Sequence, residues 1–478
     1  MHDVSYRTLM RQAEFKYLLM LCAGVWLFAA DGLMEATLLS DIVGDIGGAN
    51  LISWGRSLFE VAAIITGMLA AFLVRRFGVR TSFVSCAVLF VIGCAISALA
   101  DNMVMFQAGR FLQALSGSAF VSLTSIGIAL IFSTIMLARA GSVVAIVWGF
   151  AAFSGPLVGG LFSQFASWRT AFVYLSIFGT ILAVTSFFVL GGQRKLRLPQ
   201  INDKAEPFPT LRIGVLVAGV VLIASGGIRF SPIITPLLLI SGIVLMALFL
   251  KLDQRSADRQ LLPTGVLQLS TKVGAASYLV LLISAATIGI SVFSPILLVV
   301  LYDLAPIQIG FIMFTTALGW TFAEMKFSGT QPEHEGQVII AGALIVIGAI
   351  FVFNLGLYGE MKWLFALGFF LEGIGLGMSW SLISRRAIAD TSDLERSRIA
   401  SSVHTLQRIG FALSAAGLGV LVNGLGFSEV MSVSTAFHVM QWILGLALPF
   451  ALAGLAAAVV FAGARFNPTI DYAVNPAR

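Results

Sequence analysis

Residues 17–39, YLLMLCAGVWLFAADGLMEATLL, form an apolar run of the length that a helix needs to cross a membrane. One span takes about 20 largely apolar residues, and runs of this length recur from Tyr17 to Phe461 with short polar breaks between them. The 478 residues are 58% hydrophobic and 11% charged, whereas soluble domains are about 25% charged. The runs do not alternate in polarity as the strands of a membrane barrel do. The sequence therefore predicts an all-α polytopic membrane protein.

The polar breaks divide the chain into fourteen predicted spans. Six precede a long polar loop at 192–211, two follow it as a hairpin, and six come after the charged linker KLDQRSADRQ. We expect an N-terminal six-helix bundle at 1–191, a loop with an inserted hairpin at 192–260, and a C-terminal six-helix bundle with a short tail at 261–478. The predicted spans are 17–39, 52–74, 81–100, 103–132, 142–163, 170–191, 212–228, 232–251, 272–300, 306–325, 337–357, 362–384, 399–424 and 436–463.

Lys and Arg are distributed unevenly between the two sides of the predicted membrane. With the N-terminus in the cytoplasm, the opposite loops hold only Arg169, Arg229 and Lys362, and the other basic loop residues fall on the cytoplasmic side. Basic residues are retained on that side during insertion, so the pattern predicts that both termini are cytoplasmic. It also accounts for the net charge of +6, and we expect no nucleic-acid partner.

The two halves of the chain resemble each other at a constant offset. A shift of 259 residues lays GRFLQ at 109–113 over GFFLE at 368–372, and it lays Arg139 over Arg398. Repeated halves are typical of transporters that bind a substrate near the membrane midplane and move one half against the other.

Several ionisable residues interrupt the apolar runs of the first half. Asp31 and Glu35 are four residues apart, as are Arg56 and Glu60, so each pair shares one helix face. A rise of about 1.5 Å per residue places Asp31, Glu60 and Arg110 at similar depth, with Glu35 and Arg56 above them. Charges inside a membrane are costly and usually functional.

The group of ionisable residues at similar depth, Asp31, Glu60 and Arg110, suggests proton coupling. Burial opposes the ionisation of a carboxylate, whereas a nearby Arg favours it, and a proton-coupled carrier needs both influences. We predict that Asp31, Glu60 and Arg110 couple transport to protons. The alternative is that Arg56 with Glu60, or Arg110 with Asp31, forms a fixed ion pair that holds helices together.

Other polar residues within the spans are candidates for lining a substrate cavity. His404 lies near a cytoplasmic helix end, so ordinary solvation is an alternative for it. The predicted cavity residues are Glu35, Arg56, Gln113, Glu372, His404 and Arg408.

Enzymatic chemistry has no support in the sequence. It contains no phosphate-binding Gly-Lys-Ser/Thr loop and no nucleophile elbow. Cys22, Cys86 and Cys94 lie inside apolar spans without the spacing of metal ligands. We expect a non-enzyme that needs no metal or other cofactor.

Four stretches resemble the major facilitator superfamily, and specifically its fourteen-helix drug:proton antiporter branch. They are FLVRRFGVR at 72–80, GRFLQALSG at 109–117, SVVAIVWGFAAFSGPLVGG at 142–160, and Asp31 in the first span. The resemblance implies conformational roles for the residues that match the loop and the fifth-helix signature. These residues are Arg76, Gly78, Arg80, Gly155, Pro156, Gly159 and Gly160.

The sequence departs from the family pattern at a few positions. Arg75 stands where the loop signature has Asp, and Ala36 and Ser40 stand where the first-helix signature has Asn and Pro. Ser142 and Ala151 replace glycines of the fifth-helix signature. The first departure implies a cytoplasmic latch built differently from the family's.

The resemblance implies a major facilitator fold of two six-helix bundles with an inserted hairpin, and a proton-driven exporter of amphipathic or cationic small molecules. We expect small-molecule substrates, protons and membrane lipid as partners, a monomer, and a location in the bacterial inner membrane. Two alternatives remain. One is an exporter of an anionic metabolite such as a siderophore, bound by Arg56, Arg110 and Arg408. The other is a lipid-binding or scaffold protein without transport activity.

Overall fold

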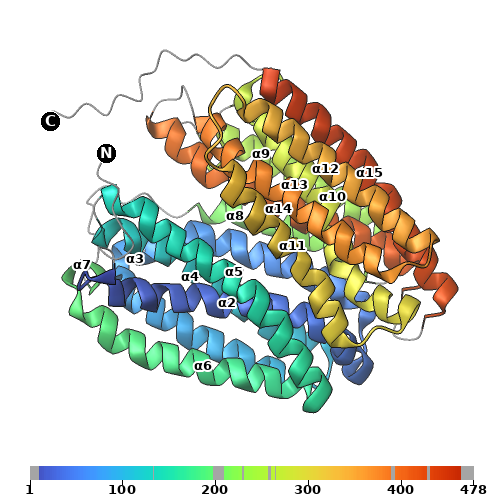
Figure 1. The fold of residues 1–478 in the computed structure, drawn as a ribbon, viewed down its shortest axis with the longest axis horizontal. Helices are drawn as coiled ribbons and strands as arrows, with labels where there is room; N and C mark the ends of the chain where they lie inside the picture. The colour runs from blue at the N-terminus through green and yellow to red at the C-terminus, as the bar shows by residue number, and fades with distance from the viewer. Residues whose placement is uncertain are drawn as a thin grey trace. The chain divides into compact units, whose positions relative to one another are not determined.

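The computed structural model describes residues 10–132, 134–197, 209–228, 231–256, 260–263, 265–388, 393–427 and 431–463. Throughout these ranges the chain forms helices joined by turns and short loops (Figure 1). The helices of at least ten residues are α2 (Phe15–Ile46), α3 (Ile52–Ala98), α4 (Met103–Ile131), α5 (Thr134–Phe165), α6 (Trp168–Val189), α8 (Thr210–Ser225), α9 (Ile234–Gln254), α10 (Lys272–Tyr302), α11 (Pro306–Phe327), α12 (Glu335–Tyr358), α13 (Lys362–Ile388), α14 (Asp393–Gly424) and α15 (Val433–Gly463).

The long helix α3 is two predicted spans joined at a kink. Gly78 has φ 77° and ψ 165°, which is not helical, and glycine reaches such a conformation without steric cost. The break predicted between the spans that end at residue 74 and begin at residue 81 falls at this kink, and helical structure continues up to Gly78 and after it.

The number of helices agrees with the prediction of fourteen. Twelve described helices are long and apolar enough to span a membrane, the second part of α3 among them. The first part of α3 and the shorter apolar helix α8 complete the set. Helices satisfy their own backbone hydrogen bonds, as the apolar core of a membrane demands. The chain is a multi-pass membrane protein.

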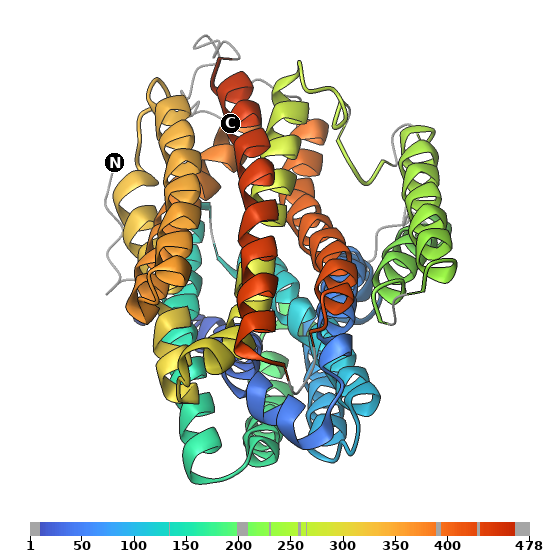
Figure 2. The ribbon, with the colours of Figure 1, turned by 90° about the vertical axis from the view of Figure 1, so that its right-hand side faces the viewer.

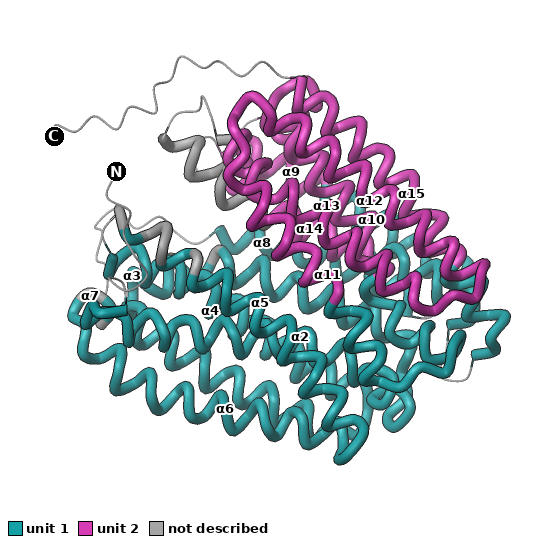
Figure 3. The backbone as a smooth tube through the Cα atoms, viewed as in Figure 1, with its two compact units in different colours: residues 1–246, 291–314, 415–440 teal, residues 247–290, 315–414, 441–478 magenta. Residues whose placement is uncertain are grey.

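The chain divides into two compact units (Figure 3). Unit 1 comprises residues 1–246, 291–314 and 415–440, and unit 2 comprises residues 247–290, 315–414 and 441–478. Within unit 1, α2 packs against α4, α5 and α6, and α3 packs against α4, α6 and α8. Within unit 2, α12 packs along α13. The division into bundles at residues 191 and 260 stays a prediction.

Close backbone contact between α3 and α4 positions the most polar part of unit 1. A Cβ atom at Gly93 would lie 2.8 Å from the Gly109 carbonyl oxygen, and one at Gly109 would lie 2.7 Å from the Gly93 carbonyl oxygen. Larger side chains would separate the helices. The contact fixes the turn of α4 that carries Arg110 and Gln113 against the end of α3.

The predicted inserted hairpin is present as α8 and α9, which Figure 2 shows lying side by side. A Cβ at Gly219 of α8 would lie 3.1 Å from the Gly242 carbonyl oxygen of α9. Small residues at this crossing allow the two backbones to approach.

Candidate functional site

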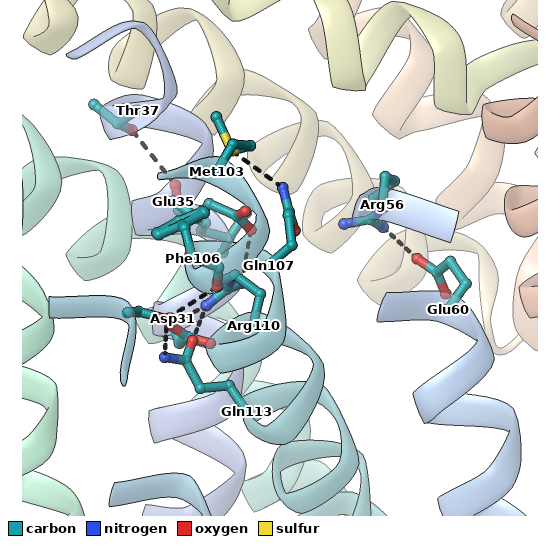
Figure 4. Close-up of polar contacts among 12 residues, drawn as sticks. Asp31, Glu35, Thr37, Arg56, Glu60, Met103, Phe106, Gln107, Arg110 and Gln113 are labelled. Carbon is teal, nitrogen blue, oxygen red and sulfur yellow. Dashed lines mark hydrogen bonds and ion pairs between the residues drawn. The ribbon is translucent and has the colours of Figure 1, made fainter. Parts of the chain in front are cut away.

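Arg110 joins two carboxylates of α2 in the middle of unit 1 (Figure 4). Its Nη1 lies 2.6 Å from Asp31 Oδ1, and its Nη2 lies 2.6 Å from Glu35 Oε2. Asp31 and Glu35 occupy successive turns of α2, so one planar guanidinium with two outward nitrogens reaches both. We call Asp31, Glu35, Arg110 and Gln113 the Arg110 cluster.

The Arg110 cluster is almost sealed from solvent. Asp31 is 0% exposed and Arg110 1% exposed, whereas the Glu35 side chain keeps 20% of its surface exposed. A buried ion is stable only when it is paired and hydrogen-bonded. Two carboxylates share one guanidinium, so the cluster carries one excess negative charge when both are ionised.

Gln113 extends the cluster to α3. Its Oε1 accepts a hydrogen bond from Arg110 Nη1, and its Nε2 donates to Ser97 Oγ at 3.1 Å. The Arg110 guanidinium also faces the rings of Phe59 and Phe172, with centroids 5.3 Å and 5.9 Å away. These contacts hold the guanidinium in one orientation between α2, α3 and α6.

Arg56 and Glu60 form a second ion pair, which Figure 4 shows apart from the Arg110 cluster. Arg56 Nη2 lies 2.5 Å from Glu60 Oε1 along α3. Both ion pairs that the sequence analysis named as an alternative, Arg110 with Asp31 and Arg56 with Glu60, are therefore present, and Arg110 also pairs with Glu35. Helical rise gives the depth of a residue, but it does not say which neighbouring helix its side chain faces.

The glycines of the fifth-helix signature bring α5 against two other helices of unit 1. A Cβ at Gly155 would lie 2.9 Å from the Ala30 carbonyl oxygen of α2, and one at Gly160 would lie 3.0 Å from Ile307 Cα of α11. A Cβ at Gly159 would lie 3.0 Å from the Met34 carbonyl oxygen, and a Cβ at Gly310 would lie 3.1 Å from Pro156 Cβ. The signature therefore forms a continuous close contact beside the helix that carries Asp31 and Glu35.

We expect Gly155→Ala to lower the thermal stability of the detergent-purified protein. The added methyl group would press on the α2 backbone, and overpacking costs about 1–3 kcal/mol. Gly141→Ala on the same helix is the matched control, because a Cβ there would meet nothing within 4 Å. Equal melting temperatures for the two variants would contradict the close contact at Gly155.

The three arginines of the signature loop at the α3 kink have different surroundings. Arg80 Nε donates to the Phe187 carbonyl oxygen at 2.9 Å, and its guanidinium lies 4.1 Å from the Phe187 ring centroid. Arg76 is exposed. The buried Nε of Arg75 has no hydrogen-bond partner among the described residues. A conformational role for Arg76, Gly78 and Arg80 stays a prediction.

Unit 2 contains a pocket of about 70 Å³ between α10, α11, α12, α13 and α14. Trp320 and Trp380 line it, with ring centroids 5.9 Å apart, and Phe411 adds a third ring. Ser284, Thr287, Ser379 and Gln407 supply polar groups. The sequence analysis did not single out these residues, because apolar helices do not reveal which face lines a pocket.

Glu372 lies on the pocket-lining face of α13. Leu376, Ser379 and Ile383 line the pocket, and the spacing of four, seven and eleven residues puts Glu372 on the same side of the helix. Glu372 is 3% exposed, and its Oε2 has no hydrogen-bond partner among the described residues. Arg408 is half-buried on α14, and the side chain of His404 lies outside the described residues.

No group of three or more His, Cys, Asp or Glu side chains that could hold a metal ion occurs among the described residues. Ion pairs, hydrogen bonds and aromatic faces are the polar contacts described above for the two units. Such groups can bind a proton or a small organic molecule.

Comparison with known proteins finds similarity to a family of transporters. Residues 20–217 match the model of the Major Facilitator Superfamily. The chain is 27% identical over 431 residues to a protein named probable multidrug-efflux transporter from Mycobacterium tuberculosis strain H37Rv, with 86% of this chain and 88% of that protein covered. It is 22% identical over 394 residues to the multidrug efflux pump SdrM of Staphylococcus aureus strain N315, with 80% and 84% covered.

The fold agrees with this relationship. A crystal structure of the peptide transporter POT in complex with sulfate superposes with a TM-score of 0.67 at 15% identity, covering 94% of this chain and 95% of that one. Over residues 20–217 the chain resembles the major facilitator superfamily, and the relatives, which are named as efflux transporters and not as enzymes, point to the drug:proton antiporter branch of that family.

Proposed function

We propose that the chain is a proton-coupled efflux transporter that exports amphipathic, cationic small molecules by alternating access. The observation that carries this proposal is the sharing of the Arg110 guanidinium by Asp31 and Glu35, inside a membrane-spanning bundle. The relatives named as multidrug-efflux transporters support the direction of transport.

The excess negative charge of the Arg110 cluster supplies the coupling. One proton on either carboxylate neutralises the cluster, and so does one cationic substrate nearby. Because an uncompensated charge is costly inside the membrane, the two occupants exclude each other, and export of one cation accompanies entry of a proton. The partly exposed Glu35 side chain provides the route for water-borne protons to the sealed Asp31.

The pocket of unit 2 suits the apolar part of such a substrate. Aromatic faces of Trp320, Trp380 and Phe411 attract flat apolar and cationic groups. The buried carboxylate of Glu372 on the same helix face favours a positive charge. A pocket with few directional contacts accepts substrates of varied structure.

The remaining parts of the proposal follow the charge pattern. The excess of basic residues in the predicted cytoplasmic loops supports a topology with both termini in the cytoplasm, and we propose the inner membrane of a bacterial cell as the location. The proton gradient drives transport without a cofactor, and a monomer embedded in lipid contains the whole Arg110 cluster.

Reconstitution in liposomes tests the function. An internal pH dye would report proton movement under an imposed pH gradient while cationic dyes, neutral drugs and metal-free siderophores are added in turn. Proton movement that depends on a cationic compound supports the proposal. Movement with siderophores alone would favour the anionic-metabolite exporter, and no movement with any compound would contradict proton-coupled transport of these classes.

We expect Glu372→Gln to raise KM for cationic substrates about tenfold and to leave KM for uncharged analogues unchanged. The variant removes one buried charge without changing the side-chain shape, and a tenfold change corresponds to ~1.4 kcal/mol. Glu333→Gln, at an exposed position before α12, is the control for the charge change alone. Equal effects on charged and uncharged substrates would contradict a role in cation binding.

A further inference from the structure

The turn between α8 and α9 offers its backbone carbonyl groups to two helices outside the hairpin. Gly226, Gly227 and Ile228 continue from α8 in tight turns. The Ile228 carbonyl oxygen accepts from Asn50 Nδ2 at 2.8 Å, and the Gly227 carbonyl oxygen accepts from Asn423 Nδ2 at 2.7 Å. Asn50 lies before α3, and Asn423 lies in the last turn of α14. All these residues belong to unit 1.

Asn423 closes a triangle of hydrogen bonds. The same Nδ2 atom also donates to the Asn50 carbonyl oxygen at 2.8 Å. One amide therefore joins the approach to α3, the hairpin turn and the end of α14. A fourth bond, from Trp54 Nε1 to Ser225 Oγ at 3.2 Å, ties α3 to the end of α8.

Two glycines let the three backbones meet. A Cβ at Gly227 would lie 2.7 Å from the Val420 backbone nitrogen, and one at Gly419 would collide with Ser53 Oγ. Any larger residue would push the turn away from α14, or α14 away from α3. The hairpin turn, Asn50 and Asn423 therefore form a fitted contact, which we call the turn clasp.

The turn clasp lies at the end of the helices opposite the cytoplasmic loops of the predicted topology. α3 comes from the first predicted half of the chain, and α14 comes from the second. If transport uses alternating access, this end must open when substrate leaves, and opening separates the start of α3 from the end of α14.

We propose that the inserted α8–α9 hairpin stabilises the closed state at the end of the helices opposite the cytoplasmic loops. In this proposal the turn clasp is a latch, whose hydrogen bonds must break before that end opens. The inference rests on the proposed alternating access and assigns a role to the two helices that the six-plus-six repeat leaves unexplained. Each of the four hydrogen bonds described above contributes little by itself, so opening can break them. Together they favour the closed state.

Distance measurement between spin labels tests the latch without any substrate. With the three native cysteines replaced by Ala, labels would be attached through Asp101→Cys and Gly424→Cys, both exposed at this end. In nanodiscs, Asn423→Ala should increase the ratio of long to short distances about fivefold, the shift expected when roughly 1 kcal/mol of closed-state stabilisation is lost. Gly227→Ala should shift it in the same direction.

Asn354→Ala is the matched control, because the Asn354 amide donates to the Ile350 carbonyl oxygen within its own helix. It should leave the distances as in the unmodified background. Wild-type distances in both Asn423→Ala and Gly227→Ala would overturn the latch, as would a loss of thermal stability without a distance change. This result is independent of the liposome assay, so a failed latch and a failed transport proposal are distinguishable.

Discussion

Arg110→Ala should reduce substrate-dependent proton movement in liposomes to below about one hundredth of the wild-type rate. The substitution leaves Asp31 and Glu35 buried together without the guanidinium that pairs with both. Removing one partner of a buried ion pair costs about 3–5 kcal/mol, and about 2.7 kcal/mol already corresponds to a hundredfold change in rate. The carboxylates would then retain protons, and the exchange with a cation would stop.

The effect must be separated from misfolding. Arg169→Ala is the control, since Arg169 also pairs with an aspartate of α2, Asp45, but its side chain is 36% exposed. We expect it to transport normally, because exposed pairs contribute about 0–1 kcal/mol. Adding Asp31→Asn and Glu35→Gln to Arg110→Ala should restore thermal stability and leave coupling absent. Proton-coupled transport in that triple variant would contradict the role of the cluster.

Most of the fold could be predicted from the hydropathy of the sequence. Spans of sufficient apolar length are a strong physical requirement, so the number of helices could be predicted even where α8 is short. The break between the second and third spans was predicted near Gly78, but its form, a single non-helical residue between two helices, is seen only in the structure.

Side-chain partners were harder to predict than helices. The spacing within Asp31 and Glu35 and within Arg56 and Glu60 put each pair on one face, and the two ion pairs named as the alternative, Arg56 with Glu60 and Arg110 with Asp31, are present. The second carboxylate partner of Arg110, Glu35, depended on how α2 and α4 face each other, which apolar sequence does not encode. The turn clasp could not be predicted, because its acceptors are backbone carbonyls. Asn50 and Asn423 are polar residues at predicted span ends, where solvation is the ordinary expectation.

The second large effect concerns the proton itself. Asp31→Asn should abolish proton movement driven by substrate, while exchange of a labelled for an unlabelled uncharged analogue across the membrane continues. Asparagine keeps the shape of the side chain and can still accept a hydrogen bond from Arg110, so the helices can stay in place. It cannot bind and release a proton, and the remaining Glu35 carboxylate balances the Arg110 charge permanently.

Glu60→Gln provides the contrasting measurement, since Glu60 is equally buried but pairs with Arg56. If the Arg110 cluster alone carries the coupling, Glu60→Gln retains proton movement, whereas coupling by both pairs would make the two variants equivalent. Unchanged transport and unchanged pH dependence in both variants would remove proton coupling from these residues. A loss of exchange of the uncharged analogue in Asp31→Asn would instead place Asp31 in substrate binding, because a purely proton-carrying group is not needed when an uncharged substrate exchanges for another.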